Sequence, residues 1–375
     1  MRSVATEADK EHVDRGAEGG LWRHTPFVLG IFISALFTAL FVSSLRLDAL
    51  RAIPARIHYS WVIAAALIFL IEFPLRTLRW QILLAPITPT RFTSLLSVTL
   101  IGFMANNVLP ARAGDLVRPV LAARKVNRPL SPILMTTVME RAFDILGLLT
   151  VFLVMFLTLP HSGAVGMSPE LLATVRRLGT TLGLIGLLGM AFLFLMAWQE
   201  HRARSTFMYL TKILPKRLRN FVMGLFDGLA LGLGSFRTVK GPLAAALISA
   251  LMWLNGSLAI WVMTRSFGFE LPFAAACFQS VTLALAVVVP QAPGFIGVWQ
   301  VAVSETLKAW GVPDGDAQGF AVVFWLASFV PITLLGLSAM WAQGLKLKNL
   351  WHTTEHIEDN VVENAVVEGR HNSLD

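Results

Sequence analysis

Long apolar runs, most of them about 20 residues or more, alternate with polar segments along most of this chain. An α-helix rises 1.5 Å per residue, so about 20 apolar residues are needed to cross the roughly 30 Å hydrocarbon core of a membrane. The pattern therefore predicts six crossing helices, over residues 26–45, 60–80, 131–159, 178–198, 242–266 and 318–342.

Two further apolar regions contain residues that break helices. The first, 92–109, runs into NNVLPARAG, and the second, 272–310, is split by VVVPQAPGFIG. Backbone that is not helical is tolerated at membrane depth only where it is buried in protein or lines a cavity. We therefore interpret each region as a re-entrant helical hairpin, which enters the membrane and returns to the same side.

The composition favours an all-α polytopic membrane protein. Hydrophobic residues make up 55% of the 375 residues and charged residues only 14%, whereas soluble domains average about 25% charged residues. The net charge of +8 lies mainly in the segments between apolar runs. This distribution indicates a topology signal and contact with anionic lipid rather than binding of nucleic acid.

The positions of Lys and Arg predict the orientation, because these residues concentrate in cytoplasmic loops. With two re-entrant hairpins, one side carries 23 Lys and Arg, in residues 1–25, 76–91, 109–130, 199–241 and the C-terminus. The opposite segments, 46–59 and 160–177, carry 5. The sequence therefore predicts both termini on the inner side.

The order of the elements predicts an inverted repeat. A polar cytoplasmic arm (1–25) precedes a transmembrane domain (26–342), and a polar acidic tail (343–375) follows it. The halves 26–160 and 178–342 would each contain two helices, a hairpin and a further helix, inserted in opposite orientations. Such repeats with broken helices are a common transporter plan, in which the binding site lies between the halves. Within the basic loop 199–241, segment 199–221 would lie on the inner leaflet as an interfacial helix or form a solvated loop.

Several kinds of chemistry lack a sequence signal. The single cysteine, Cys277, leaves no internal disulfide and no cysteine metal site. His352 and His356 lie in the polar tail without other ligands, and no nucleotide-binding, zinc-protease or serine-hydrolase motif is present. We therefore expect no enzyme activity, no metal and no cofactor. An intramembrane enzyme that uses Glu140 and Asp144 as acid and base is the remaining catalytic alternative.

The first hairpin holds a concentration of polar side chains: Asn106, Asn107, Arg112, Gly114, Asp115 and Arg118. A charge at the bilayer centre costs roughly 2.5–3.5 kcal/mol on insertion scales, so such groups face a cavity or each other. Arg112 and Arg118, on either side of Asp115, suit a phosphate, with positive-inside retention as the alternative. The two asparagines either cap the broken helix or bind substrate.

The helix over 131–159 carries Glu140, Arg141 and Asp144 near its start. Spacing of three and four residues places these side chains on neighbouring positions of one face. If Arg141 pairs with Asp144, Glu140 needs another cation, such as Arg112 or Arg118. The set either lines a polar passage for a headgroup or a proton, or locks the hairpin to this helix through salt bridges.

Two other clusters are candidates. Arg76 and Arg79 at the end of the second helix either bind substrate or extend to the inner surface, and Glu72 is placed to pair with Arg76 along the helix. In the second hairpin, Pro293, Gly294 and Gly297 precede Glu305. The turn forms a gate or a site, or it is only packed. Glu305 either belongs to this site or reaches the outer surface.

At these residues the chain resembles the flippase-like membrane proteins related to the transmembrane region of lysylphosphatidylglycerol synthase, a group that includes hopanoid-associated members. The similar motifs are R-x-x-R-W from Arg76, N-x-x-L-P-x-R-x-G-D-x-x-R from Asn107, E-R-x-x-D from Glu140 and P-G-x-x-G from Pro293. Asp115 stands where glutamate is commoner, and Gln300 stands near the usual last glutamate.

The resemblance implies a protein of the bacterial cytoplasmic membrane that moves a lipid or lipid-linked substrate between leaflets. Its site would comprise the motif residues above. An alternative is a membrane partner that does not transport but presents lipid to a glycosyltransferase or synthase. The synthase activity of the family belongs to a separate soluble domain, for which the roughly 30 residues after the last predicted helix offer no room.

Overall fold

The computed structural model describes residues 55–109, 112–158, 240–287 and 293–345, together with scattered positions between 35 and 43 and between 173 and 223. Regular structure in this part of the chain is entirely helical. The helices expected over 26–45 and 178–198 lie largely outside the described residues, as do the basic loop, the polar arm and the acidic tail.

Four helical segments in the described ranges are long and apolar enough to cross a membrane. They are α3 (Tyr59–Leu70) continued by α4 (Glu72–Leu84), α7 (Leu130–Thr158), α11 (Lys240–Ser266) and α14 (Asp314–Ala342). Each coincides with a predicted crossing helix. The turn at Ile71 that divides α3 from α4 follows from Pro74, which has no N–H to donate to the carbonyl of Leu70.

The outer faces of these helices are apolar. Leu67, Leu153, Leu247 and Leu334 are each more than half exposed. A soluble protein rarely exposes so many large aliphatic side chains on adjacent helices, whereas lipid accommodates them. The described part of the chain is therefore a multi-pass helical membrane protein.

Both interrupted regions form antiparallel helical pairs. In the first, α5 (Phe92–Val108) and α6 (Gly114–Val126) pack so closely that a Cβ on Gly114 would lie 1.9 Å from the carbonyl oxygen of Gly102. In the second, α12 (Phe273–Ala286) is followed by a 3-10 turn, η3 (Pro293–Phe295), and by α13 (Val298–Ala309). Trp310, after α13, packs among residues near the start of α12, which closes that hairpin.

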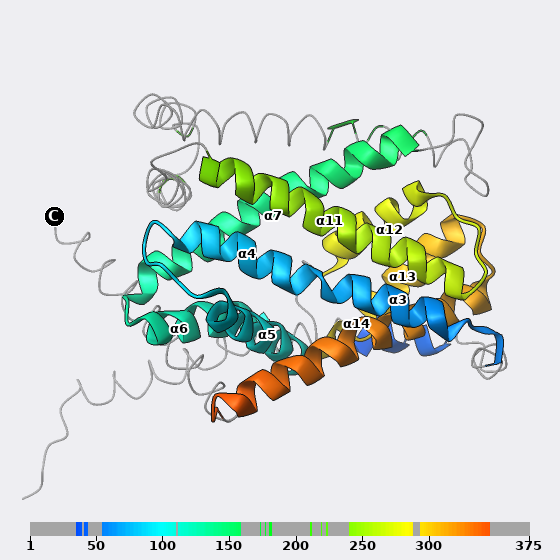
Figure 1. Ribbon diagram of the computed structural model, residues 1–375. Helices are drawn as coiled ribbons and strands as arrows, with labels where there is room; N and C mark the ends of the chain where they lie inside the picture. The colour runs from blue at the N-terminus through cyan, green and yellow to red at the C-terminus, as the bar shows by residue number, and fades with distance from the viewer. Residues whose placement is uncertain are drawn as a thin grey trace, which may run out of the picture.

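The two hairpins enter the bundle from opposite ends (Figure 1). At one end, the start of α5 and the end of α6 lie together, because Lys125 reaches Ser94 and Gln343, beyond the end of α14. At the other, His58 before α3 donates to the carbonyl of Ser266 at the end of α11. The tips of the two hairpins meet between these two ends of the bundle, where Arg112 donates to the carbonyl of Val287.

The packing of the hairpins is reciprocal. Helix α5 of the first hairpin packs on α14, where a Cβ on Gly336 would lie 2.2 Å from the Cβ of Met104. Helix α12 of the second hairpin packs on α7, with Ala274 and Cys277 against Val151 and Met155. Helix α5 thus rests on α14 and helix α12 on α7, while α6 also contacts α7, α13 also contacts α14, and the α3–α4 segment packs on α11.

Candidate functional site

The tip of the first hairpin is held by a reciprocal contact between α5 and α6. The side-chain oxygen of Asn106 accepts from the backbone N–H of Asp115 at 3.1 Å, and its side-chain nitrogen donates to Oδ1 of Asp115 at 3.0 Å. Helix α6 has no side-chain cap of its own at Ala113. Asn106 therefore supplies from α5 the contact that a capping residue normally makes, which is one of the two roles considered for it from the sequence.

A buried set of ion pairs joins α4, α6 and α7. Arg79 donates to Asp144 at 2.7 Å and to Ser249 of α11 at 2.8 Å. Arg118 pairs with Glu140. The side chains of Arg79, Glu140 and Arg118 are 1%, 3% and 9% exposed. These pairs are shielded from solvent, so they act as a lock between helices.

The aromatic ring of Trp80 completes this lock. The guanidinium carbon of Arg118 lies 4.5 Å from the ring centroid, and the indole N–H donates to Thr136 on α7 at 2.9 Å. A cation over an indole face is attracted by the ring quadrupole, and more strongly where water is excluded. The guanidinium of Arg118 is thus occupied by its ion pair with Glu140 and its contact with Trp80.

A second set of charges, continuous with the first, is only partly buried within the protein. Arg141 and Arg112 both approach Oδ2 of Asp115, at 2.8 Å and 3.4 Å. The side chains of Arg141, Arg112 and Asp115 are 50%, 32% and 35% exposed. Asp115 therefore holds two accessible guanidinium groups side by side, and Arg141 also lies 3.6 Å from Asp144.

The whole network carries an excess of positive charge. Four arginines (79, 112, 118 and 141) face three carboxylates (Asp115, Glu140 and Asp144). The buried pairs balance each other, so the surplus lies at the accessible Arg112–Asp115–Arg141 cluster. The Nε of Arg112 is buried and lacks a partner among the described residues, which leaves a further donor.

A bilayer centred on α7 would place the network at membrane depth. Glu140 is ten residues into α7, or about 15 Å at 1.5 Å per residue. A hydrocarbon core of about 30 Å, centred on this 29-residue helix, would begin roughly 7 Å from the helix end. The charges would then lie about 8 Å inside the hydrocarbon boundary, where they are stabilised by one another rather than by bulk water.

The network reaches the second hairpin at the point where the tips meet. Besides the bond from Arg112 to Val287, Asn107 donates to Thr333 of α14 at 2.9 Å. Asn107 and Glu72 share with Gly294 the lining of a hollow of about 130 Å³ that is otherwise mostly aromatic. The end of α5 and the turn of the second hairpin therefore line a common hollow.

The structure decides between alternatives for two residues. The extension of Arg79 to the inner surface is wrong, because its side chain is 1% exposed and bonded to Asp144 and Ser249. Of the two cations considered for Glu140, Arg118 is confirmed as its partner and Arg112 is not. The intrahelical pair of Glu72 and Arg76 is confirmed, with Arg76 Nε donating at 2.8 Å.

The turn of the second hairpin lies near the candidate site, whereas the carboxylate of that hairpin, Glu305, does not belong to the site. Gly294 and Gly297 have φ of 74° and 88°, left-handed values that suit glycine. Gln300 accepts from the N–H of Gly297 at 2.8 Å and so fixes the start of α13. Glu305 is 60% exposed and pairs with Lys308, away from the charge network.

Ser249 and Trp80 are the members of the charge network that the sequence analysis did not single out. The R-x-x-R-W motif was the available signal for Trp80.

Comparisons with known proteins connect this chain with a group of membrane proteins. The family profile described as "Lysylphosphatidylglycerol synthase TM region" matches residues 27–336. A UPF0104 membrane protein of Methanothermobacter thermautotrophicus is 25% identical over 298 residues, covering 76% of this chain and 85% of the relative. A UPF0104 membrane protein of Methanocaldococcus jannaschii is 24% identical over 233 residues, covering 62% and 90%.

A further relative bears the name of an enzyme. Glycosyltransferase AglD of Haloferax volcanii is 24% identical over 339 residues, which are 84% of this chain but 54% of AglD. The chain thus spans about half the length of that relative. These three relatives come from archaea, so they lend no support to a specifically bacterial membrane. No solved structure matches the chain significantly.

Proposed function

The chain belongs to the lysylphosphatidylglycerol synthase TM region family, and from this premise we propose that it moves a lipid or lipid-linked substrate with an anionic headgroup between the leaflets of a membrane. The observation that carries the proposal is the accessible Arg112–Asp115–Arg141 cluster at membrane depth, where two broken hairpins meet. A polar group that crosses a bilayer needs such partners on its way.

The division of the network assigns different roles to its arginines. Arg112 and Arg141 would hold a headgroup phosphate, because their guanidiniums converge on one carboxylate oxygen and remain accessible. Asp115 would release one or both arginines as the phosphate binds. Arg118 and Arg79 would keep the hairpin in register with α7 through Glu140 and Asp144. Acyl chains would stay in lipid beside the exposed leucines.

The reciprocal packing of the hairpins supports an inverted repeat, with halves 26–160 and 178–342. In such a plan the site lies at the interface between halves, and rocking of one half against the other exposes it alternately to each side. The bond from Arg112 to the Val287 carbonyl crosses this interface. It would break when the second hairpin moves, so that hairpin, through Pro293, Gly294 and Gly297, would act as the gate.

Lipid scrambling in reconstituted vesicles tests the transport proposal. With fluorescent phosphatidylglycerol, the double variant Arg112→Gln/Arg141→Gln is expected to scramble at least about a hundredfold more slowly, because it loses two charge-assisted bonds to phosphate, each worth about 1.5–3 kcal/mol. Arg128→Gln removes an exposed charge outside the network and should scramble like the wild type. Equal rates in all three proteins would contradict the proposal.

The proposed membrane placement can be tested by cysteine labelling in a Cys277→Ser background. Pro89→Cys and Arg128→Cys lie at opposite ends of the first hairpin in sequence, yet at the same end of the bundle. A membrane-impermeant maleimide should modify both from the cytoplasmic side. Glu270→Cys and Pro313→Cys, which flank the second hairpin, should react only from the opposite side. Labelling of 89 and 128 from different sides would exclude a re-entrant hairpin.

The similarity to Glycosyltransferase AglD favours a second candidate function. The chain would bind its lipid in the same cluster but present it to a glycosyltransferase or synthase instead of moving it. This candidate predicts that the purified protein retains lipid, that Arg112→Gln/Arg141→Gln loses it, and that neither protein scrambles. Mass spectrometry of co-purified lipid separates this result from transport.

A further inference from the structure

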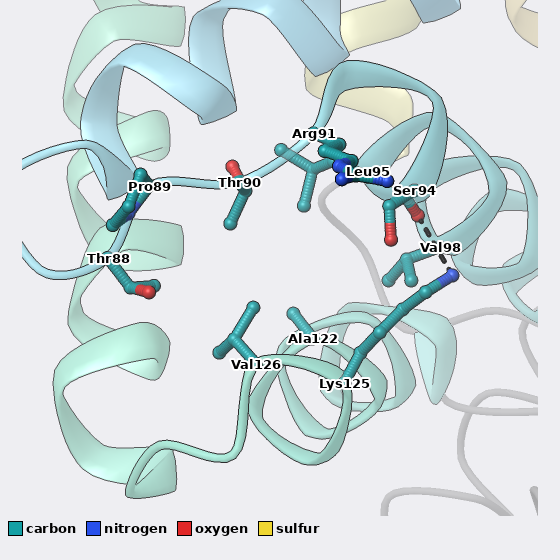
Figure 2. Close-up of a pocket in the computed structure, with 10 residues that line it drawn as sticks. All are labelled: Thr88, Pro89, Thr90, Arg91, Ser94, Leu95, Val98, Ala122, Lys125 and Val126. Atoms are coloured by element: carbon teal, nitrogen blue, oxygen red, sulfur yellow. Dashed lines mark hydrogen bonds between the residues drawn. The ribbon is translucent and has the colours of Figure 1, made fainter.

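A second hollow, of about 240 Å³, lies at the end of the first hairpin that is remote from its tip (Figure 2). Its walls are the α4–α5 loop, the first turn of α5 and the last turns of α6. Lys125 on this wall is eleven residues along α6 from Gly114, or about 16 Å from the hairpin tip. The hollow is therefore separate from the Arg112–Asp115–Arg141 cluster.

Two cations line this pocket without a carboxylate to balance them. Among the described residues, neither Arg91 nor Lys125 forms a salt bridge. The ammonium of Lys125 lies 3.4 Å from each of three neutral oxygens, those of the Ser94 carbonyl, the Ser97 hydroxyl and the Gln343 side chain. These contacts are long, so the ammonium remains available to an anion.

The start of α5 adds backbone donors to the same wall. The helix begins at Phe92, and Arg91 at its N-cap makes no side-chain capping bond. The first amides of a helix have no partners within the helix and carry partial positive charge, which favours an anion there. Ser94, in this first turn, lines the pocket.

Two threonines of the α4–α5 loop, Thr88 and Thr90, line the pocket. Thr88 is 7% exposed, and Figure 2 shows its side chain directed toward the space enclosed by the α5 and α6 walls. No hydrogen bond joins the Thr88 hydroxyl to another described residue, and the hydroxyl of Thr90 beside it is buried without a partner among the described residues. Burying a hydroxyl without a partner is unfavourable, so a bound acceptor near Thr90 would stabilise this arrangement.

We propose that this pocket binds a phosphate group, held by Arg91, Lys125, the hydroxyl of Thr88 and the first amides of α5. The 240 Å³ volume is several times the roughly 30 Å³ that a water molecule occupies in the liquid. It accommodates a tetrahedral phosphate and the first atoms of an ester substituent. Leu95 and Ala122 provide apolar contact for that substituent. The phosphate belongs either to a lipid headgroup or to a free phosphate ion.

Binding measurements on the full-length protein in detergent micelles test this site independently of transport. The probes are dioctanoyl phosphatidic acid, dioctanoylglycerol as its counterpart without phosphate, and inorganic phosphate against chloride at equal ionic strength. Lys125→Gln is expected to weaken phosphatidic acid binding about tenfold, the loss typical of one charge-assisted hydrogen bond. Thr88→Val, which keeps the side-chain shape, should weaken it several-fold.

Arg124→Gln is the matched control, because it removes the same charge from the preceding, exposed position of α6, and it should bind like the wild type. Arg91→Gln should weaken binding as Lys125→Gln does, and because Arg91 is exposed, misfolding would not explain its loss. Binding of phosphatidic acid alone identifies a lipid headgroup as the source, and binding of inorganic phosphate as well, or alone, identifies a site for the free group. Absence of both, or equal losses in Arg124→Gln and Lys125→Gln, overturns the proposal.

Discussion

Replacement of Arg79 by glutamine is expected to destabilise the protein by about 3–5 kcal/mol, the cost of breaking one side of a buried ion pair. Arg79 binds Asp144 at 2.7 Å and Ser249 at 2.8 Å, and it lies 3.5 Å from Glu140. Without it, two carboxylates at membrane depth depend on Arg118 and on the 3.6 Å contact from Arg141. The measurement is the thermal unfolding midpoint in detergent.

Two further variants separate loss of the pair from loss of the side chain. Arg79→Gln/Asp144→Asn removes both charges, so it should recover a substantial part of the lost stability, as neutral replacement of a buried pair commonly does. Arg141→Gln removes a cation that is 50% exposed, and should cost no more than about 1 kcal/mol. If Arg79→Gln unfolds at the wild-type temperature, the buried pairs do not form the lock described above.

The crossing helices were predictable because a helix in lipid requires a continuous run of apolar residues along the chain. An unbroken apolar run of sufficient length has few alternatives to a membrane helix. The observed bounds of α7, α11 and α14 accordingly begin or end within a few residues of those expected, and α14 extends four residues earlier, to Asp314. The helix breaks were visible for a related reason, since proline and glycine interrupt the pattern at the tips.

The pairing of charges was only partly predictable, because it depends on contacts between distant segments. Local spacing identified Glu72 with Arg76, and the shortage of nearby cations made Arg118 one of two candidates for Glu140. The Arg79–Asp144 pair joins residues 65 positions apart, and Ser249 is 170 positions from Arg79. The sequence alone does not place α4 and α11 side by side, so it does not reveal that Arg79 points inward.

The burial of the arginine side chains changes which of them are candidate phosphate ligands. From residue types, Arg112 and Arg118 were equivalent phosphate ligands on either side of Asp115. The structure separates them, because Arg118 is 9% exposed and stacked on Trp80, whereas Arg112 is 32% exposed and shares Asp115 with Arg141. Arg118 holds the first hairpin in place through Glu140, and Arg112 presents an accessible positive charge beside it. We infer that recognition and locking are divided between neighbouring turns of α6 and α7.

Substitution of Gly114 by alanine is expected to prevent closure of the first hairpin. The new Cβ would lie 1.9 Å from the Gly102 carbonyl oxygen and 2.6 Å from the Asn106 backbone nitrogen. Both contacts are with backbone, so a side-chain rotation cannot relieve them and α6 must move away from α5. Overpacking typically costs about 1–3 kcal/mol and more where the backbone resists, so we expect the upper part of this range or beyond.

The same displacement should impair the site, because Asp115 follows Gly114 directly and binds Asn106 through its backbone and side chain. Gly114→Ala should therefore lower both the unfolding midpoint and the scrambling rate. Gly256→Ala on α11 is the control: a Cβ at this position would have no neighbouring atom within 4 Å, and alanine favours a helix over glycine by about 1 kcal/mol. It should be neutral or slightly stabilising. Wild-type stability and scrambling in Gly114→Ala would show that the close contact of α5 with α6 does not position the charge cluster.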